Sequence, residues 1–386
     1  MSDSKFCSFL CRQSGEPLAG SAPFAEHFVF ISWPKKYWEY EALESKGGFP
    51  TGLKQWMKEK SKISGKISIR LASQAKLEND KVELFIYPGK WYYSNVLPKE
   101  IPEVLESHFQ HYKTSDFSCK KIEREQIFIC THGRHDKCCA KFGQILADQM
   151  QYHVQKQNYS VEVWESSHLG GHRFAATMID FPSGRVYGRM TPDEIPRFLE
   201  SRKQGQVYGS AYRGSIFLPE LEQVAEAHVQ HYCSVQQLDC QVKIKNLEKL
   251  REDKFRCTAA FEINKSSAES QNNIPDELAF SFKLKDFESP SGCDALEEPQ
   301  LRKCWELELP LSTKSIKNSG GRLCGGSDTV TLEEAFRLSC NIPFAELGLE
   351  LGEAEIASVA EDFGFGATLE IPLTVTPSSF PRGMDQ

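Results

Sequence analysis

The stretch from Cys130 to His172 constrains this chain more than any other part of its sequence. Cys130 and Cys139 are spaced C-x8-C, and His168 and His172 are spaced H-x3-H. Thiolate and imidazole are the side chains that best hold transition metals and iron–sulfur clusters. Cys130 ends one apolar predicted strand and His168 follows the next, at the sheet edge where sites form in open α/β layers. The pattern predicts a metal centre with the ligands Cys130, Cys139, His168 and His172.

The residues around these ligands favour the same interpretation. Cys139 lies beside the start of a predicted helix, where a thiolate is stabilised. Cys138 is its direct neighbour, and only one of two adjacent cysteines can usually point at a given centre. Gly170 and Gly171 permit a tight turn between the two histidines. We interpret two further residues of the first loop, His132 and His135, as loop or supporting residues.

The ligand types leave the metal open. Two cysteines and two histidines form a legitimate tetrahedral zinc set. They are also the ligands of a Rieske-type 2Fe-2S centre, in which histidines replace the cysteines on one iron. The spacing matches neither zinc fingers nor Rieske signatures.

Composition and charge narrow the partners and the compartment. The chain has 386 residues and a net charge of −7, which argues against nucleic acid or an anionic membrane as partners. No apolar run is long enough for a membrane span, and the N-terminus lacks a signal-peptide pattern. Thirteen scattered cysteines favour a cytoplasmic protein with reduced thiols. Cys7 and Cys11 are predicted to be reduced surface thiols; a second ligand pair or a redox switch is the alternative.

Hydrophobic periodicity predicts an α/β chain that contains an internal duplication. Both copies read as strand, helix, strand, hairpin and helix, which is the thioredoxin-like order. The last helices of the two copies share the sequence E-I-P-x-x-L-E-S, which begins at Glu100 and again 94 residues later at Glu194. The first copy is predicted to have strands at 27–32, 66–71, 81–87 and 91–96 and helices at 50–61 and from 98. The second copy is predicted to have strands at 126–130, 160–165, 174–180 and 185–189 and helices at 139–155 and from 192.

Four regions follow from this pattern. Residues 1–118 form a degenerate thioredoxin-like unit, because the same shift takes the four ligands to Lys36, Ser45, Gln74 and Glu78. Residues 119–233 form the thioredoxin-like unit that bears the ligands. Residues 234–312 read as a small β-rich domain without evident chemistry. Residues 313–386 read as a glycine-containing linker and a short helical tail, with helices at 331–352 and 353–363.

Two motifs resemble the sucrase/ferredoxin-like family. They are Cys130-Thr-His-Gly-x-x-Asp-x-x-Cys139 and Trp164-Glu-Ser-Ser-His-Leu-Gly-Gly-His172, and the likeness extends over roughly residues 5–312. The resemblance implies a thioredoxin-like ferredoxin with a 2Fe-2S cluster. It further implies that Cys130 and Cys139 hold one iron and that His168 and His172 hold the other. No carboxylate pair is placed for glycoside hydrolysis, so the sucrase label implies no activity here.

The tail resembles part of a penicillin-binding protein transpeptidase domain. Gly325-Gly-Ser-Asp-Thr and the S-x-N motif at Ser339 carry this likeness. The chemistry also needs an S-x-x-K nucleophile and a K-T-G strand. No K-T-G is present, and the S-x-x-K matches at Ser73 and Ser118 lie far upstream. We therefore expect no transpeptidase activity.

The sequence thus predicts an electron carrier rather than an enzyme. This carrier would pass single electrons to an unknown redox partner protein. Histidine ligation should raise the cluster potential, and proton uptake by the ligands should make that potential fall as pH rises. A structural zinc-binding interaction protein is one alternative. A thiol oxidoreductase is another, but it would require a C-x-x-C motif at a helix start, and none occurs in the chain.

Overall fold

The computed structural model describes residues 5–75, 77–110, 117–235, 240–263, 277–310, 356 and 358–360. The chain divides into two compact units, residues 1–309 and residues 310–386. The predicted linker and the predicted helix at 331–352 lie outside the described residues. Within the predicted helix at 353–363, the described residues 356 and 358–360 are helical.

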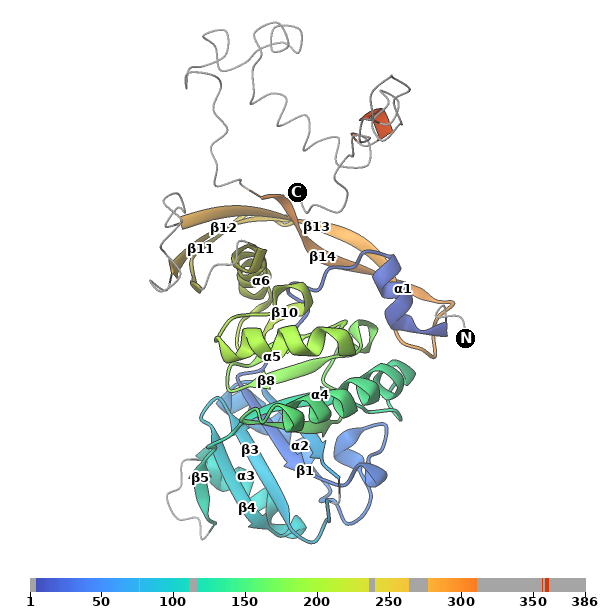
Figure 1. Cartoon of the computed structure of the whole chain (residues 1–386). Helices are drawn as coiled ribbons and strands as arrows, with labels where there is room; N and C mark the ends of the chain where they lie inside the picture. Colours follow the sequence, from blue (N-terminus) through green and yellow to red (C-terminus); the bar gives the residue numbers. More distant parts are fainter. Residues whose placement is uncertain are drawn as a thin grey trace, which may run out of the picture. The chain divides into compact units, whose positions relative to one another are not determined.

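A ten-stranded mixed sheet forms the body of the first unit (Figure 1). Its strand order is β10-β9-β8-β6-β7-β2-β1-β3-β4-β5. The strands are β1 (His27–Ser32), β2 (Ile67–Ser73), β3 (Val82–Tyr87), β4 (Trp91–Val96), β5 (Cys119–Lys121), β6 (Glu125–Cys130), β7 (Val161–Ser166), β8 (Met178–Phe181), β9 (Arg185–Tyr187) and β10 (Tyr212–Ser215). The chain is therefore of mixed α/β class, as predicted.

Helices and short helical turns connect these strands. The α-helices are α1 (Cys7–Gln13), α2 (Leu53–Ser64), α3 (Ile101–Gln110), α4 (Gln144–Lys156), α5 (Ile195–Lys203) and α6 (Glu220–Val235). The shorter turns are η2 (Lys35–Tyr37), η3 (Ala42–Glu44), η4 (Pro98–Glu100), η5 (Cys139–Gly143), η6 (His172–Phe174), η7 (Pro192–Glu194) and η8 (Gly209–Ala211). The predicted strand at 174–180 begins only at Met178, because the chain first completes the 3-10 turn η6.

The strand pairing in the sheet repeats once. β1 pairs in parallel with β2 and antiparallel with β3, which pairs with β4. β6 pairs in parallel with β7 and antiparallel with β8, which pairs with β9. The two halves join where β2 runs antiparallel to β7. The unit boundary at residue 118 stays a prediction, because strands from both sides of it belong to one sheet.

The two halves also share a hydrophobic core. The inner strands β1 and β6 are each buried over five of their six residues, as expected for strands covered on both faces. Phe30 of β1 and Phe128 of β6 stack with ring centroids 3.7 Å apart, and Phe181 of β8 meets both rings edge-on. These aromatic contacts cross from one half to the other, so the sheet forms a rigid platform beneath the loops at the ends of β6 and β7.

A second, four-stranded antiparallel sheet follows α6. Its strands, in spatial and chain order, are β11 (Cys240–Arg251), β12 (Lys254–Ile263), β13 (Glu277–Pro290) and β14 (Pro299–Pro310). Val224 and Val229 of α6 pack in one buried cluster with Phe255, Phe282 and Trp305 of this sheet. All four strands lie within residues 234–312, where the sequence predicts β structure.

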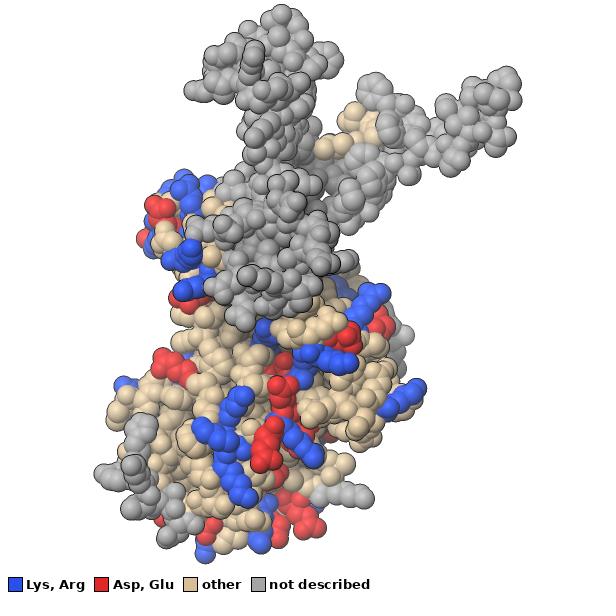
Figure 2. Space-filling view, turned by 60° about the vertical axis from the view of Figure 1, so that its left-hand side comes forward, with Lys and Arg blue, Asp and Glu red and all other residues tan. Residues whose placement is uncertain are grey.

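The described surface is mixed in charge. On the face drawn in Figure 2, Lys and Arg side chains are interspersed with Asp and Glu. Several of these groups form surface ion pairs, such as Lys54 with Glu41 and Glu44. Among the described residues, no helix combines the length and apolar character needed to cross a membrane.

Candidate metal centre

The two predicted cysteine ligands lie side by side. Cys130 is the last residue of β6, and Cys139 is the first residue of the turn η5. Their Sγ atoms are 3.3 Å apart, both residues are 1% exposed, and both are free cysteines. The contact between the two sulfurs lowers the pKa of Cys130 and raises the pKa of Cys139. The pair is therefore suited to bind one metal ion through both sulfurs.

A π-helical turn and a glycine bring the second cysteine to the first. Residues Cys139–Gly143 form the π-helical turn η5, a feature that often occurs at functional sites. A Cβ atom on Gly143 would lie 1.9 Å from the carbonyl oxygen of Cys130. Because glycine lacks that atom, the helix start can approach the end of β6 closely enough to join the two sulfurs.

The two predicted histidine ligands follow β7. Ser167 anchors the chain there, since its N–H donates to the carbonyl of Leu71 at 2.8 Å. Gly170 and Gly171 then turn the backbone with φ of 92° and 77°. A Cβ on Gly171 would lie 2.5 Å from the guanidinium of the buried Arg213, whose Nη1 donates to the Gly170 carbonyl. The turn predicted from this glycine pair is confirmed.

The donor atoms form a connected chain. Those of Cys130, Cys139 and His168 lie within 4.8 Å of one another. Those of His135, His168 and His172 form a second such group. His168 belongs to both groups, and its ring centroid is 5.3 Å from that of His172. The structure thus brings three of the four predicted ligands into one group and places His172 in a neighbouring group that shares His168.

Two buried nitrogen atoms indicate where a bound group would fit. The Nδ1 atoms of His168 and His172 are buried, and no described group forms a hydrogen bond with either. Buried polar atoms without partners are rare in folded proteins, and each needs an explanation. Ligation would satisfy both nitrogen atoms. The two overlapping donor groups therefore fit a metal cluster whose ligands include both sulfurs and both imidazoles.

His132 holds the histidine loop in place. Its Nδ1 accepts a hydrogen bond from the His168 N–H at 3.2 Å, so the ring proton is assigned to Nε2, which donates to the Glu39 carbonyl at 2.8 Å. Burial lowers the pKa of His132, which favours this neutral form. The prediction of a supporting role agrees with these bonds. His135 lies closer to the centre than predicted, because its ring stacks on His168 at 3.8 Å.

The prediction of surface thiols at Cys7 and Cys11 is wrong, since both residues are 0% exposed. The Cys11 thiol donates to Glu16 at 3.2 Å, whereas Cys7 lies 3.4 Å from Cys138. Cys138 also lies 3.2 Å from Cys293, in the turn between β13 and β14. No local motif predicts this contact, because the two cysteines are 155 positions apart in the chain.

Comparisons with known proteins identify the family of the chain. The profile described as sucrase/ferredoxin-like matches residues 18–214, which is half of the chain. The chain belongs to this family. The Debaryomyces hansenii protein named "Altered inheritance of mitochondria protein 32" is 32% identical over 110 residues, which are 27% of this chain and 40% of that protein.

The C-terminal part of the chain is similar to a different family. The penicillin binding protein transpeptidase domain profile matches residues 302–382. The peptidoglycan D,D-transpeptidase PbpA of Mycolicibacterium smegmatis is 37% identical over 100 residues, which are 26% of this chain and 20% of that protein. The chain thus spans 40% or less of the length of these relatives.

Among solved structures, the thioredoxin-like [2Fe-2S] ferredoxin from Aquifex aeolicus is similar to 23% of this chain and covers 90% of its own length. The identity is 15% and the TM-score is 0.22. A likeness at this level does not define the architecture of the chain.

Proposed function

We propose that the chain is a one-electron carrier whose 2Fe-2S cluster is held by Cys130, Cys139, His168 and His172. One observation carries the proposal: two buried sulfurs 3.3 Å apart share a donor group with His168, and the buried Nδ1 atoms of His168 and His172 have no hydrogen-bond partner among the described residues. Membership of the sucrase/ferredoxin-like family supports the same assignment. When bound, such a cluster accepts and returns a single electron.

The surrounding residues perform the tasks that such a carrier requires. The sulfur side is closed to solvent, since Cys130 and Cys139 are each 1% exposed and lie in one buried cluster with Phe128 and Leu169. His168 and His172 are only partly buried. A cavity of about 170 Å³ opens beside His135 and His168. We therefore assign the histidine side as the route by which electrons enter and leave.

The repeated strand pairing supports an interpretation as two thioredoxin-like units. In this interpretation the half with β6 to β9 bears the cluster, and the half with β1 to β4 is a degenerate scaffold. Residues 12–118 contain no cysteine, so the first half cannot supply an equivalent thiolate pair. The partner is an unidentified redox protein. The net charge of −7 favours a protein partner over nucleic acid or an anionic membrane, and a cytoplasmic location stays a prediction.

Two other functions are less well supported by the geometry. Zinc could bind the same four ligands and would make the site structural. A thiol oxidoreductase would need an accessible attacking thiolate, and both sulfurs of the pair are buried. Neither alternative explains why the more exposed side of the site is formed by histidines.

Metal analysis of the full chain tests the proposal. Protein purified without oxygen should be coloured and contain two irons and two acid-labile sulfides at this site, as a 2Fe-2S cluster requires. Reduction with dithionite should bleach the colour and produce a paramagnetic signal. Colourless protein with zinc at these ligands and no labile sulfide would overturn the proposal.

A further inference from the structure

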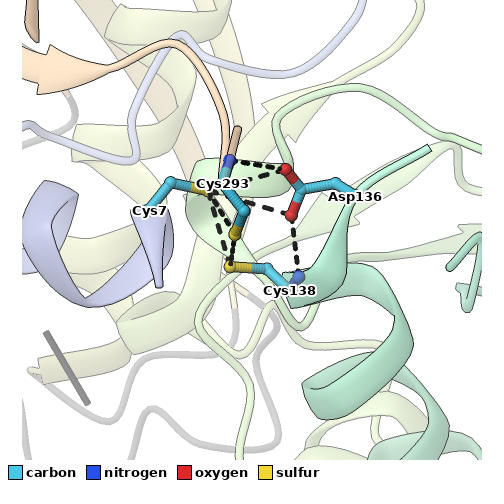
Figure 3. Close-up of side chains that lie close together, drawn as sticks. All are labelled: Cys7, Asp136, Cys138 and Cys293. Atoms are coloured by element: carbon cyan, nitrogen blue, oxygen red, sulfur yellow. Dashed lines mark hydrogen bonds between the residues drawn. The ribbon is translucent and has the colours of Figure 1, made fainter. Parts of the chain in front are cut away.

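A second group of side chains that could bind a metal contains Cys138, the direct neighbour of the candidate ligand Cys139 in the chain (Figure 3). It consists of Cys7, Asp136, Cys138 and Cys293, whose donor atoms all lie within 4.8 Å of one another. The three Sγ–Sγ distances are 3.4 Å for Cys7–Cys138, 3.2 Å for Cys138–Cys293 and 3.6 Å for Cys293–Cys7. The Cys7 Sγ lies 3.9 Å from Oδ1 of Asp136 and 4.0 Å from Oδ2.

Three distant parts of the chain supply these residues. Cys7 begins α1, Asp136 and Cys138 precede the turn η5, and Cys293 lies in the turn between β13 and β14. All four residues are at most 6% exposed. A disulfide would use only two of the sulfurs. The mutual approach of three sulfurs and a carboxylate instead matches the ligand shell of one ion.

The distances agree with a tetrahedral ion bound to sulfur. Zinc–sulfur bonds of about 2.3 Å place two sulfurs about 3.8 Å apart at the edge of a tetrahedron. The observed separations of 3.2 to 3.6 Å fall within about 0.6 Å of that edge. Because all three sulfurs are close to each other, they fit one ion rather than different irons of a larger cluster.

Asp136 gives a second, independent indication of a cation. Its carboxylate accepts hydrogen bonds from the N–H of Cys138 at 2.7 Å and of Cys293 at 2.9 Å. None of the described ion pairs places a Lys or Arg beside this buried carboxylate. A buried charge without an opposite charge is costly. A divalent cation would supply that charge, and the two N–H donors would orient the carboxylate toward it.

We propose that Cys7, Cys138, Cys293 and Asp136 bind one Zn²⁺ ion, in a structural site separate from the candidate cluster. Three thiolates favour soft ions such as zinc, and four protein ligands close the site in the way that structural zinc sites are closed. Binding converts three thiols to thiolates and releases three protons. The Ser8 hydroxyl lies 3.2 Å from the Cys138 sulfur and can donate to its thiolate.

The zinc ion would hold the cluster ligands in position. Cys138 directly precedes Cys139, so an ion bound to Cys138 would fix the position of the first residue of η5. The turn that bears Cys293 also presents the Ser291 carbonyl, which lies 2.5 Å from Nε2 of His172. If Nε2 donates to this carbonyl, the Nδ1 of His172 stays available as a ligand. The proposed zinc site would thus position one sulfur ligand and one histidine ligand.

The test uses the full chain purified without oxygen. Zinc, iron and labile sulfide are measured per chain, and X-ray absorption at the zinc edge gives the zinc ligands. We expect one zinc bound to three sulfurs and one oxygen. Cys293→Ser should weaken zinc binding at least about tenfold against a competing chelator, since even residues behind the ligands contribute that much. Cys293→His should retain zinc, because imidazole is also a zinc ligand.

Cys11→Ser is the matched control, because Cys11 is a second buried cysteine of α1 outside the group. Its zinc content should stay at the wild-type level. Wild-type protein without zinc, or with a disulfide between two of the three cysteines, would overturn the proposal. The proposal would also be overturned if zinc were bound to two sulfurs and two nitrogens and were lost in Cys139→Ala, because the zinc would then lie at the candidate cluster site. Protein that contains iron and sulfide but no zinc would overturn the zinc site and leave the proposed function standing. Protein that contains zinc with the expected three-sulfur shell but no iron would overturn the proposed electron-carrier function and leave the zinc site standing.

Discussion

The two halves of the large sheet pair their strands in the same order but end them in different residues. Cys130 is paired in parallel with Ser166. Strand pairing makes Ser32, paired in parallel with Ala72, its counterpart in the first half, and not Lys36 as the shift of 94 residues predicted. Ser32 forms a structural bond, since its Oγ accepts a hydrogen bond from the Glu83 N–H at 2.7 Å. The same pairing pattern therefore supports a thiol ligand in one half and a backbone support in the other.

The residues after these strands differ in the same way. In the first half, the fully buried Trp33 follows β1, packs on Phe49 and donates from Nε1 to the Lys46 carbonyl at 3.0 Å. In the second half, a polar loop follows β6 and leads to Cys139. Strand pairing therefore determines the sheet, whereas the few residues at and beyond the strand ends determine whether that edge of the sheet can bind a metal.

The largest effect should come from removing a sulfur ligand. Cys139→Ala should lower iron and labile sulfide per chain at least about tenfold, since a direct ligand contributes more than the residues behind it. Absorbance and iron assays measure this. Cys119→Ser, which changes an exposed cysteine of β5, should leave both unchanged. Full iron content in Cys139→Ala would contradict the assignment of this ligand.

Exchanging one ligand type for the other should shift the potential without removing the cluster. His172→Cys replaces a neutral ligand by a thiolate, which makes the cluster more negative and harder to reduce. The spread between histidine-containing and all-cysteine clusters suggests a decrease on the order of 100 mV. A redox titration followed by absorbance measures the shift. An unchanged or higher potential would show that His172 is not a ligand.

A buried ion pair next to the site should contribute to stability in a pH-dependent way. Burial alone would raise the pKa of Glu16, but hydrogen bonds and charge from Arg173, together with Ser289, outweigh it and lower the pKa. Glu16→Gln should therefore lower the free energy of unfolding by about 2 kcal/mol at pH 7. Because a lowered carboxyl pKa stabilises the fold only while the group is ionised, this difference should shrink as pH falls below about 4.5.

Urea denaturation of both proteins between pH 7 and pH 4 measures that difference. Glu106→Gln in the first half is the control, because Glu106 pairs with Lys60 nearer the surface, where ion pairs contribute about 0–1 kcal/mol. Equal losses in the two variants at pH 7 would contradict the role assigned to the buried pair.

The smallest effect should come from the first half. Trp33→Phe removes the hydrogen bond to the Lys46 carbonyl and should cost about 1 kcal/mol of stability. If the first half is only a scaffold, the iron content and the potential should not change. A shifted potential at unchanged iron content would show that this half influences the redox site.

Sequence patterns predicted much of this structure, but only where the signal is local. The hairpin of β3 and β4 follows from two runs rich in apolar residues on either side of Pro88-Gly89. The spacing of the cysteine and histidine pairs pointed to Cys130, Cys139 and His168, whose donor atoms lie within 4.8 Å of one another, whereas His172 falls in the neighbouring group. The junction of β2 with β7 depends on long-range pairing and has no local signature. The same reason explains why the approach of Cys7 to Cys293, 286 residues away, was missed.

The proposed function requires that two imidazole nitrogens bind the cluster directly. The most direct test is electron–nuclear double resonance on the dithionite-reduced protein, with histidine labelled with ¹⁵N. We expect two strongly coupled histidine nitrogens, one of which disappears in His172→Cys. A reduced cluster without any strongly coupled histidine nitrogen would contradict it.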